Sequence, residues 1–213
     1  CVSLGIVVNR DAERFYDEGE DFWPKRYAIW GRLVAHQPGQ IAYSVIDAKA
    51  VGRFMPPVFP PESAPTLEQL ARKLGLDEAA FMRTVEAYNA ACRVGRFDHA
   101  VLDDCRTAGL APAKTHWARP IDTPPFHAYP LKPGITFTYL GVKVDRDAAV
   151  HFGGAPSSNL FAAGEVMAGN VLGQGYTAGV GMTIGSAFGR IAGSRAARAA
   201  LGVASKESNR AAA

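Results

Sequence analysis

The fold of this chain is decided by residues 159–193, which read NLFAAGEVMAGNVLGQGYTAGVGMTIGSAFGRIAG. An apolar run typical of a β-strand ends in Gly164 and Glu165, a glycine-rich loop follows, and a helix is predicted to begin near Gly179. An acidic side chain at the carboxyl end of a strand can accept hydrogen bonds from a ribose. The start of a helix offers free N–H groups and a positive dipole end to an electron-rich ligand. This stretch therefore predicts a nucleotide-cofactor site.

Glycine recurs at every fourth position of the predicted helix, at Gly181, Gly185, Gly189 and Gly193. This spacing places the glycines on one helix face, where the backbone can pack closely against a neighbouring element or a flat ring. Glycines spaced in this way also occur in pairs of membrane helices. Arginines at positions 190, 195 and 198, and the lack of an apolar run of about twenty residues, argue against a membrane span. A tightly packed structural helix stays open as an alternative.

Residues 173–178 read GQGYTA and match the dinucleotide-binding fingerprint with alanine in its last place. That fingerprint opens the first helix of a βαβ unit, and an acidic residue follows about twenty residues later, after a second strand. The corresponding positions here hold Ser194 and Arg195. We therefore do not interpret this motif as a dinucleotide site.

Composition excludes several classes of function. With 213 residues, 48% of them hydrophobic, the chain can bury a core in one or two domains. The formal net charge of +3 is small and the basic residues are dispersed, so no nucleic-acid partner is indicated. Cys1, Cys92 and Cys105 lack CxxC spacing, so we predict buried thiols in a reducing compartment, without a disulfide framework or a metal site.

The beginning of the chain indicates a longer protein. There is no initiator Met and no leader, and a strand is predicted at 5–9 with almost no preceding segment. We therefore expect further sequence before Cys1.

The pattern along the chain predicts an α+β fold. Strands are expected at 5–9, 41–47, 126–131, 135–145 and 159–166, and helices from Pro24 to before Pro38 and at 67–74, 78–92 and 179–200. Thr66 and Asp77 are predicted N-caps, 56–65 an extended proline-rich connector, and 95–125 a loop-rich crossing. The composition shifts at about Gly134, from a mixed region to a strand-rich piece that ends in one helix.

Several of these stretches together resemble a known superfamily. They are GIVVNRDAERF at 5–15, PPFHA at 124–128, TYLGVKVD at 138–145, and LFAAGE at 160–165 through FGRIAG at 188–193. They resemble the carboxyl half of the fumarate reductase/succinate dehydrogenase flavoproteins. Within that superfamily, DEG at 17–19 and GNVLGQGYTAG at 169–179 look most similar to FAD-dependent tricarballylate dehydrogenases.

The resemblance implies a domain organisation and a cofactor. Residues 1–134 would be most of a capping domain that closes over the substrate, and residues 135–213 the returning part of an FAD-binding domain. The amino-terminal nucleotide-binding unit would precede Cys1 and is missing from the chain. Gly164 and Glu165 would meet the FAD ribose. The backbone of Gly181, Met182, Thr183 and Ile184 would face the pyrimidine edge of the flavin.

The chain also departs from the family pattern. The proton-donating arginine of fumarate reductases aligns with Phe22, and the nearest replacement is Arg26. The family's histidine aligns with Phe137, and its substrate arginine in the glycine loop aligns with Tyr176. We therefore do not expect fumarate reduction. In having a tyrosine at the glycine-loop position, Tyr176, the chain is similar to the related ketosteroid dehydrogenases.

Desaturation of a carbon chain sets requirements for the site. It needs a base, a flavin that accepts hydride, and cations or donors that hold carboxylates. Arg26 and Tyr176 are the predicted catalytic residues, and Arg26, Arg32, Thr138 and Tyr176 the predicted substrate-binding residues. A planar guanidinium matches a carboxylate, although a solvated surface arginine is an equal alternative for Arg26. We assign no catalytic role to His36 or His127.

These inferences lead to one hypothesis with two alternatives. The chain is interpreted as part of an FAD-dependent dehydrogenase that oxidises tricarballylate to cis-aconitate and passes electrons to an iron–sulfur partner. By resemblance the protein would be cytoplasmic and would meet the inner face of the membrane through that partner. A ketosteroid-type desaturase and a non-catalytic cap that binds a ligand or a subunit are the alternatives. We expect the 213-residue chain alone to be inactive and to bind FAD weakly.

Overall fold

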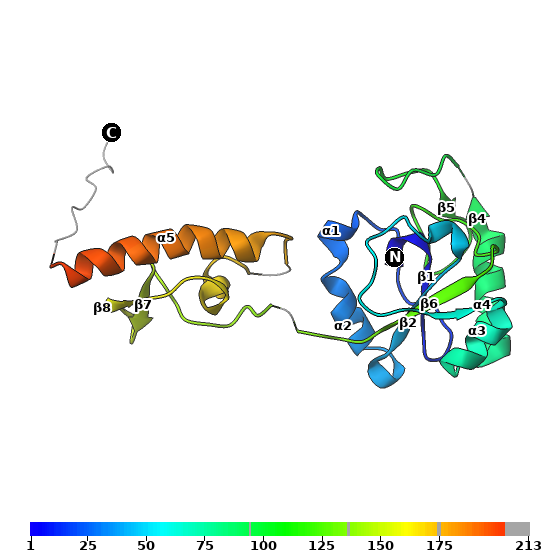
Figure 1. Cartoon of the computed structure of the whole chain (residues 1–213), viewed down its shortest axis with the longest axis horizontal. Coiled ribbons are helices and arrows are strands. Elements are labelled where there is room, and N and C mark those ends of the chain that lie inside the picture. The colour runs from blue at the N-terminus through cyan, green and yellow to red at the C-terminus, as the bar shows by residue number, and fades with distance from the viewer. Residues whose placement is uncertain (94, 136, 174–175, 203–213) are drawn as a thin grey trace. The chain divides into compact units, whose positions relative to one another are not determined.

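The chain folds into two compact units, Cys1–Gly134 and Ile135–Ala213, in a computed structural model (Figure 1). The structure describes residues 1–93, 95–135, 137–173 and 176–202. We describe each unit by itself.

The first unit is built on an antiparallel sheet of four strands in the order β1-β2-β6-β3. The strands are β1 (Ile6–Asn9), β2 (Ala42–Ile46), β3 (Glu62–Ala64) and β6 (Phe126–Leu131). Val45 pairs with Ile6 on one side and with Ala128 on the other. Every residue of β1 and β2 is buried, so both faces of the sheet are covered.

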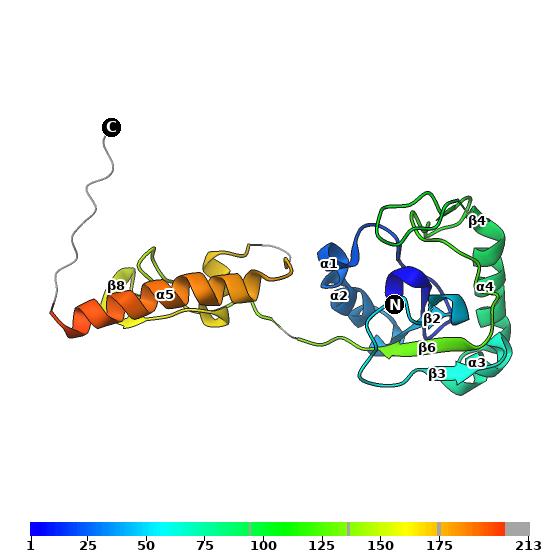
Figure 2. The same cartoon turned by 45° about the horizontal axis from the view of Figure 1, so that its top comes forward.

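Helices cover the two faces of this sheet. On one face, α3 (Leu67–Leu74) and α4 (Glu78–Ala91) contribute Leu70, Phe81 and Tyr88 to a core with Ile6 and Val8 (Figures 1 and 2). On the other face, residues of α2 (Ile29–Ala35), which follows α1 (Trp23–Arg26), pack against Val7 and Ala42. Alternate residues of β1 thus enter different cores, as the two-residue period of a strand requires.

The helical hairpin α3–α4 confirms the predicted caps. The Thr66 hydroxyl accepts a hydrogen bond from the Gln69 amide, and the Asp77 carboxylate accepts one from the Ala80 amide at 2.7 Å. Each cap satisfies an amide that the first helical turn leaves open. The left-handed Gly75 ends α3 at φ +68°.

Two predictions for the first unit were wrong in detail. The helix expected after Pro24 is divided into α1 and α2, and the proline-rich connector contains the short strand β3. Pairing with β6 explains the strand β3, because the unpaired edge of β6 can bind a further strand of three residues. The remaining elements are the 3-10 helices η1 (Val2–Leu4), η2 (Pro38–Gln40) and η3 (Ala48–Ala50), and the paired strands β4 (Cys92–Arg93) and β5 (Arg106–Thr107).

The second unit consists of a hairpin, a 3-10 helix and a long helix. Strands β7 (Ala149–Phe152) and β8 (Ala155–Phe161) pair antiparallel, η4 (Glu165–Asn170) follows, and α5 (Val180–Ala200) ends the described chain. None of the described helices is long and apolar enough to cross a membrane. The helix predicted at 179–200 is confirmed, and its observed start at Val180 differs from the prediction by one residue.

The strand predicted at 135–145 was wrong, and the one predicted at 159–166 is confirmed only over residues 159–161. In the described part of 135–145 only Val144 makes a bridge, to Val150, and β8 ends at Phe161, before the 3-10 helix that begins at Glu165. The segment around Gly141 lies against η4 instead of entering a sheet. A methyl group on Gly141 would lie 1.8 Å from the Val166 carbonyl oxygen, so the two backbones touch where only glycine fits.

Candidate cofactor and substrate sites

In the second unit, the structure brings Thr138 and Glu165 together. The Thr138 amide donates to Glu165 Oε1 at 2.7 Å, and its hydroxyl donates to the same oxygen at 3.2 Å. Glu165 is exposed and follows Gly164, whose φ of +85° turns the chain at this point. Among the described residues no contact is formed by Oε2 of Glu165. One carboxylate oxygen is therefore held in place while the other can accept bonds from a ligand.

Asn170 fixes the segment that carries Thr138, a role that the sequence analysis missed. Its Nδ2 donates to the carbonyls of Val142 and Met167, both at 2.8 Å, and its Oδ1 accepts from the Val144 amide. The side chain thus joins η4 to the preceding loop. No sequence pattern distinguishes this asparagine from others in turns, because its partners are backbone groups, and Val142 and Val144 are distant from it in sequence.

The start of α5 is open to a ligand. Its N-cap is Gly179, with φ +84°, and no side chain caps the helix. The Thr183 hydroxyl turns back to the Gly179 carbonyl, Ile184 is buried, and Met182 is 82% exposed. The first turn of a helix without a side-chain cap leaves amides for an electron-rich ligand.

Aromatic side chains gather beside this turn. Phe137 lies 5.2 Å from Tyr176 and 6.3 Å from Tyr139 between ring centroids. A methyl group on Gly181 would lie 3.1 Å from the Phe137 ring, which confirms close approach of a flat ring at this glycine. At Gly185, Gly189 and Gly193, by contrast, a methyl group would meet no atom of the described chain within 4 Å.

These residues fit a flavin nucleotide. A carboxylate oxygen such as that of Glu165 can accept hydrogen bonds from ribose hydroxyls, and the amides of an uncapped helix start can donate to the carbonyl edge of a flavin ring. The Phe137 ring lies against Gly181, where a larger residue would crowd it.

In the first unit, Arg26 is held by an acidic partner. Its guanidinium forms an ion pair with Glu20, whose other oxygen accepts a hydrogen bond from the Tyr16 hydroxyl at 2.6 Å. The bond to Glu20 raises the pKa of Tyr16. Arg26 Nε is buried and makes no hydrogen bond within the described chain. Arg32, the other predicted substrate arginine, is exposed on α2, and the structure shows no contact between the two.

Aromatic rings surround the Arg26 segment. Trp30 lies 5.9 Å from Tyr16 and 6.5 Å from Trp23 between centroids, and Trp23 lies 6.3 Å from Tyr27. Rings packed in this way fix α1 although it has only four residues. The guanidinium of Arg26 and the carboxylate of Glu20 thus lie in a segment that is packed with aromatic rings.

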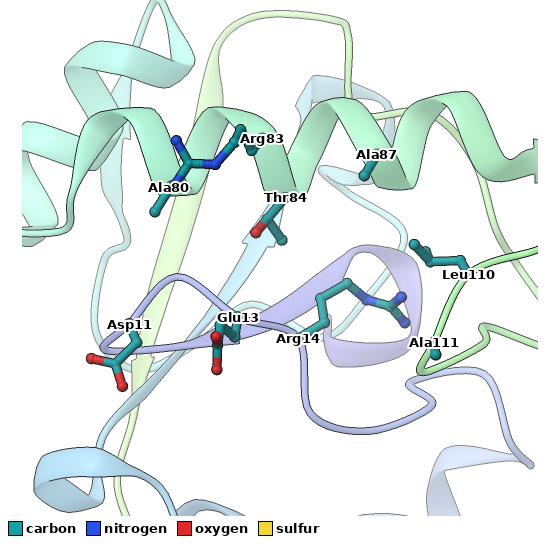
Figure 3. A pocket seen from close by; sticks show the side chains of 9 residues that line it. All are labelled: Asp11, Glu13, Arg14, Ala80, Arg83, Thr84, Ala87, Leu110 and Ala111. Carbon is teal, nitrogen blue, oxygen red and sulfur yellow. The ribbon is translucent and has the colours of Figure 1, made fainter.

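A cavity of about 420 Å³ lies between α4 and the turn after β1 (Figure 3). Its charged lining is mixed in sign and consists of Asp11, Glu13, Arg14 and Arg83. Arg14 is buried here and pairs with Glu18 at 2.6 Å, and Glu18 also accepts from the Val7 amide. Arg14 is thereby neutralised, and the charged groups that remain in the lining are the carboxylates of Asp11 and Glu13 and the guanidinium of Arg83.

His36 and His127 have structural partners. His127 Nδ1 lies 2.7 Å from the Ser63 hydroxyl across strands β6 and β3, and burial lowers its pKa. His36 Nδ1 lies 2.7 Å from the Arg32 carbonyl at the end of α2.

Comparison with known proteins identifies the family. The profile of the FAD binding domain family matches residues 4–182. A relative from Klebsiella pneumoniae, an NADH:fumarate oxidoreductase, is 32% identical over 92% of this chain and 20% of its own length. The 4-oxocyclohex-2-ene-1-carboxylate 5-dehydrogenase of Sinomonas cyclohexanicum is 29% identical over 92% of this chain and 36% of its own length. The chain thus spans about a fifth to a third of these relatives.

Solved structures agree with this assignment. The open conformation of a flavocytochrome c3 fumarate reductase matches with a TM-score of 0.67 at 28% identity, over 93% of this chain and 33% of that one. The 3-ketosteroid-Δ4-(5α)-dehydrogenase of Rhodococcus jostii RHA1 matches with a TM-score of 0.57 at 29% identity, over 92% and 39%. The chain therefore belongs to the FAD binding domain family, a family of FAD-dependent oxidoreductases, and FAD is the cofactor that its site serves.

Proposed function

We propose that the chain is part of an FAD-dependent dehydrogenase that oxidises a polycarboxylate, with tricarballylate as substrate and cis-aconitate as product. The observation that carries the proposal is the pairing of Thr138 with Glu165 beside the uncapped start of α5, where aromatic rings stand in place of proton donors. Residues 1–134 would serve as the cap and residues 135–213 as part of the FAD-binding domain.

The acid–base group of the reaction must lie outside the family's usual positions. Reduction of a C=C bond needs an acid that delivers a proton to the substrate carbon, and oxidation needs the conjugate base of such a group to take that proton away. The positions that align with the family's proton donor and histidine hold Phe22 and Phe137, which can do neither. Phe137 instead packs against Tyr176. Oxidation is proposed here on the resemblance to tricarballylate dehydrogenases.

Each candidate residue has a separate task in this proposal. Glu165 would bind the ribose and the first amides of α5 would meet the flavin ring, which accepts hydride from the substrate when FAD is bound. Arg26 would hold a substrate carboxylate in place of Glu20, since a planar fork binds a carboxylate at two points. Tyr176 would contribute a donor, whereas the Thr138 hydroxyl donates to Glu165, and an iron–sulfur protein would receive the electrons.

The names of relatives support a carboxylate substrate. Besides the fumarate oxidoreductase and the cyclohexene carboxylate dehydrogenase named above, the relatives include a urocanate reductase of Eggerthella lenta and an NADH:acrylate oxidoreductase of Vibrio harveyi. Fumarate, urocanate and acrylate are conjugated carboxylates, so a carboxylate beside the reacting bond is common to them.

Steady-state turnover tests the proposal. We expect the full-length protein to convert tricarballylate to cis-aconitate with an artificial electron acceptor, and product is measured directly by chromatography. Succinate serves as the matched control, because it lacks the third carboxylate. If the protein turns over neither acid, the polycarboxylate proposal is contradicted.

A ketosteroid-type desaturase is the second candidate. The rings of Phe137, Tyr139 and Tyr176 favour it, because an aromatic surface suits an apolar fused-ring substrate. Turnover of 4-androstene-3,17-dione without turnover of tricarballylate would establish this candidate in place of the first. A non-catalytic cap is the third, and reduction of bound FAD by either compound would rule it out.

A further inference from the structure

Two arginines of the first unit share one aromatic ring. The guanidinium carbon of Arg119 lies 3.8 Å from the centroid of Phe97, and that of Arg53 lies 5.4 Å from the same centroid. Phe97 lies between β4 and β5 and is half-buried. A ring face attracts a cation, so each arginine gains from the ring. The two positive charges nevertheless repel each other.

Neither guanidinium has an ion-pair partner among the residues that the structure describes. Arg53 donates through Nε to the Lys49 carbonyl at 2.9 Å. Arg119 Nε is buried and makes no hydrogen bond in the described chain. Burial lowers the pKa of Arg119, and the charge of Arg53 lowers it further. Two neighbouring cations that lack an anionic partner repel each other, and an anion bound between them removes this repulsion.

The backbone holds both arginines in place. Lys49 Nζ donates to the carbonyl of Pro120, next to Arg119, at 2.9 Å, while the Lys49 carbonyl accepts from Arg53. The Ala118 amide, on the other side of Arg119, donates to the Cys105 carbonyl. Lys49 itself is neutralised by Asp47 and Asp122. Asp47 and Asp122 are therefore engaged by Lys49, although the charge of Asp47 also acts on Arg119 and raises its pKa.

We propose that Arg53 and Arg119, stacked on Phe97, bind a carboxylate of the substrate. The planar guanidinium groups match a planar carboxylate, and a polycarboxylate supplies more carboxylates than Arg26 alone can hold. Arg26 already has Glu20 as a partner, whereas this pair has none in the described chain. The inference rests on the proposed polycarboxylate oxidation and adds a specificity site to it.

Calorimetric titration of the full-length protein tests this site. Tricarballylate is titrated into the protein after its flavin has been reduced with dithionite, so that binding is measured without turnover. Arg119→Lys keeps the charge and loses the planar fork, and we expect it to raise Kd about tenfold, whereas Arg119→Met should raise it about a hundredfold. Arg53→Lys should act in the same direction. Arg93→Lys is the control, because Arg93 is exposed and, within the residues that the structure describes, its side chain bonds only to the carbonyls of Ala90 and Cys92.

The outcomes separate this site from the proposed reaction. Turnover of tricarballylate with an unchanged Kd in both Arg119 variants would overturn the site and leave the reaction intact. Binding that depends on Arg119, without turnover, would support the site and contradict the reaction. A lower Tm for the Arg119 variants with an unchanged Kd would show a packing role only, which also overturns the site.

Discussion

Glu165→Gln tests how the second unit binds its cofactor. The substitution keeps the size of the side chain, and the amide oxygen can still accept the bond that Thr138 donates at 2.7 Å. What is lost is the second carboxylate oxygen, because the amide nitrogen takes its place and cannot accept a hydrogen bond from a ribose hydroxyl. A hydrogen bond to a charged group contributes about 1.5–3 kcal/mol. Its loss predicts a rise in the Kd for FAD of about tenfold to 150-fold.

The assay is fluorescence titration of the full-length apoprotein with FAD. Asp147→Asn is the matched control, because Asp147 is an acidic residue of the same unit whose partner is Arg195 on α5. We expect the control to bind FAD as the wild type does. Thr138→Val should have a smaller effect than Glu165→Gln, since the amide bond to Glu165 remains. A Kd for Glu165→Gln within twofold of the wild type would refute this role of Glu165.

Three further predictions concern the first unit. Arg26→Lys should lower kcat/KM for tricarballylate about tenfold to a thousandfold with an unchanged FAD spectrum, while the control Arg32→Lys should have no effect. If both variants have the kcat/KM of the wild type, Arg26 does not bind the substrate carboxylate. Glu18→Gln leaves the buried Arg14 without its counter-charge, so urea denaturation should show a loss of about 3–5 kcal/mol in unfolding free energy, and a loss below about 1 kcal/mol would be evidence against this pair. Burial lowers the pKa of Lys114 to about 8 from 10.5, so the unfolded chain binds that proton more tightly and stability should rise from pH 8 to 10.5. Denaturation across this range should show a smaller rise for Lys114→Met, and equal profiles would contradict the shift.

Local signals in the sequence predicted much of the first unit. The caps at Thr66 and Asp77 act within one helical turn, and the structure confirms them. The short strand β3 could not be predicted in the same way. It exists because β6, more than sixty residues later in the chain, offers it an edge.

The second unit shows where a periodic pattern misleads. Residues 135–145 alternate like a strand, yet Ile135 and Leu140 are 87% and 88% exposed, and the chain there follows η4 through glycine contacts. Such contacts between backbones leave no pattern in side-chain polarity. The pairing of Thr138 with Glu165 depends on them, so each residue could be selected from the sequence although their contact could not.

The site in the first unit was only partly visible from sequence. Arg26 was selected for its chemistry, but its pairing with Glu20 arises from the turn before α1. Arg53 and Arg119 were not selected, because they are 66 positions apart in the printed sequence and no local motif joins them. Only the fold brings both to Phe97.

Anaerobic reduction of the flavin by substrate is the most direct test of the central claim. Purified full-length protein with oxidised FAD is mixed with tricarballylate in the absence of any other acceptor. We expect the visible absorbance of the flavin to be lost while one cis-aconitate forms for each FAD reduced. The opposite result would be a flavin that stays oxidised with tricarballylate but is reduced by 4-androstene-3,17-dione. That result would contradict the proposal of a polycarboxylate dehydrogenase.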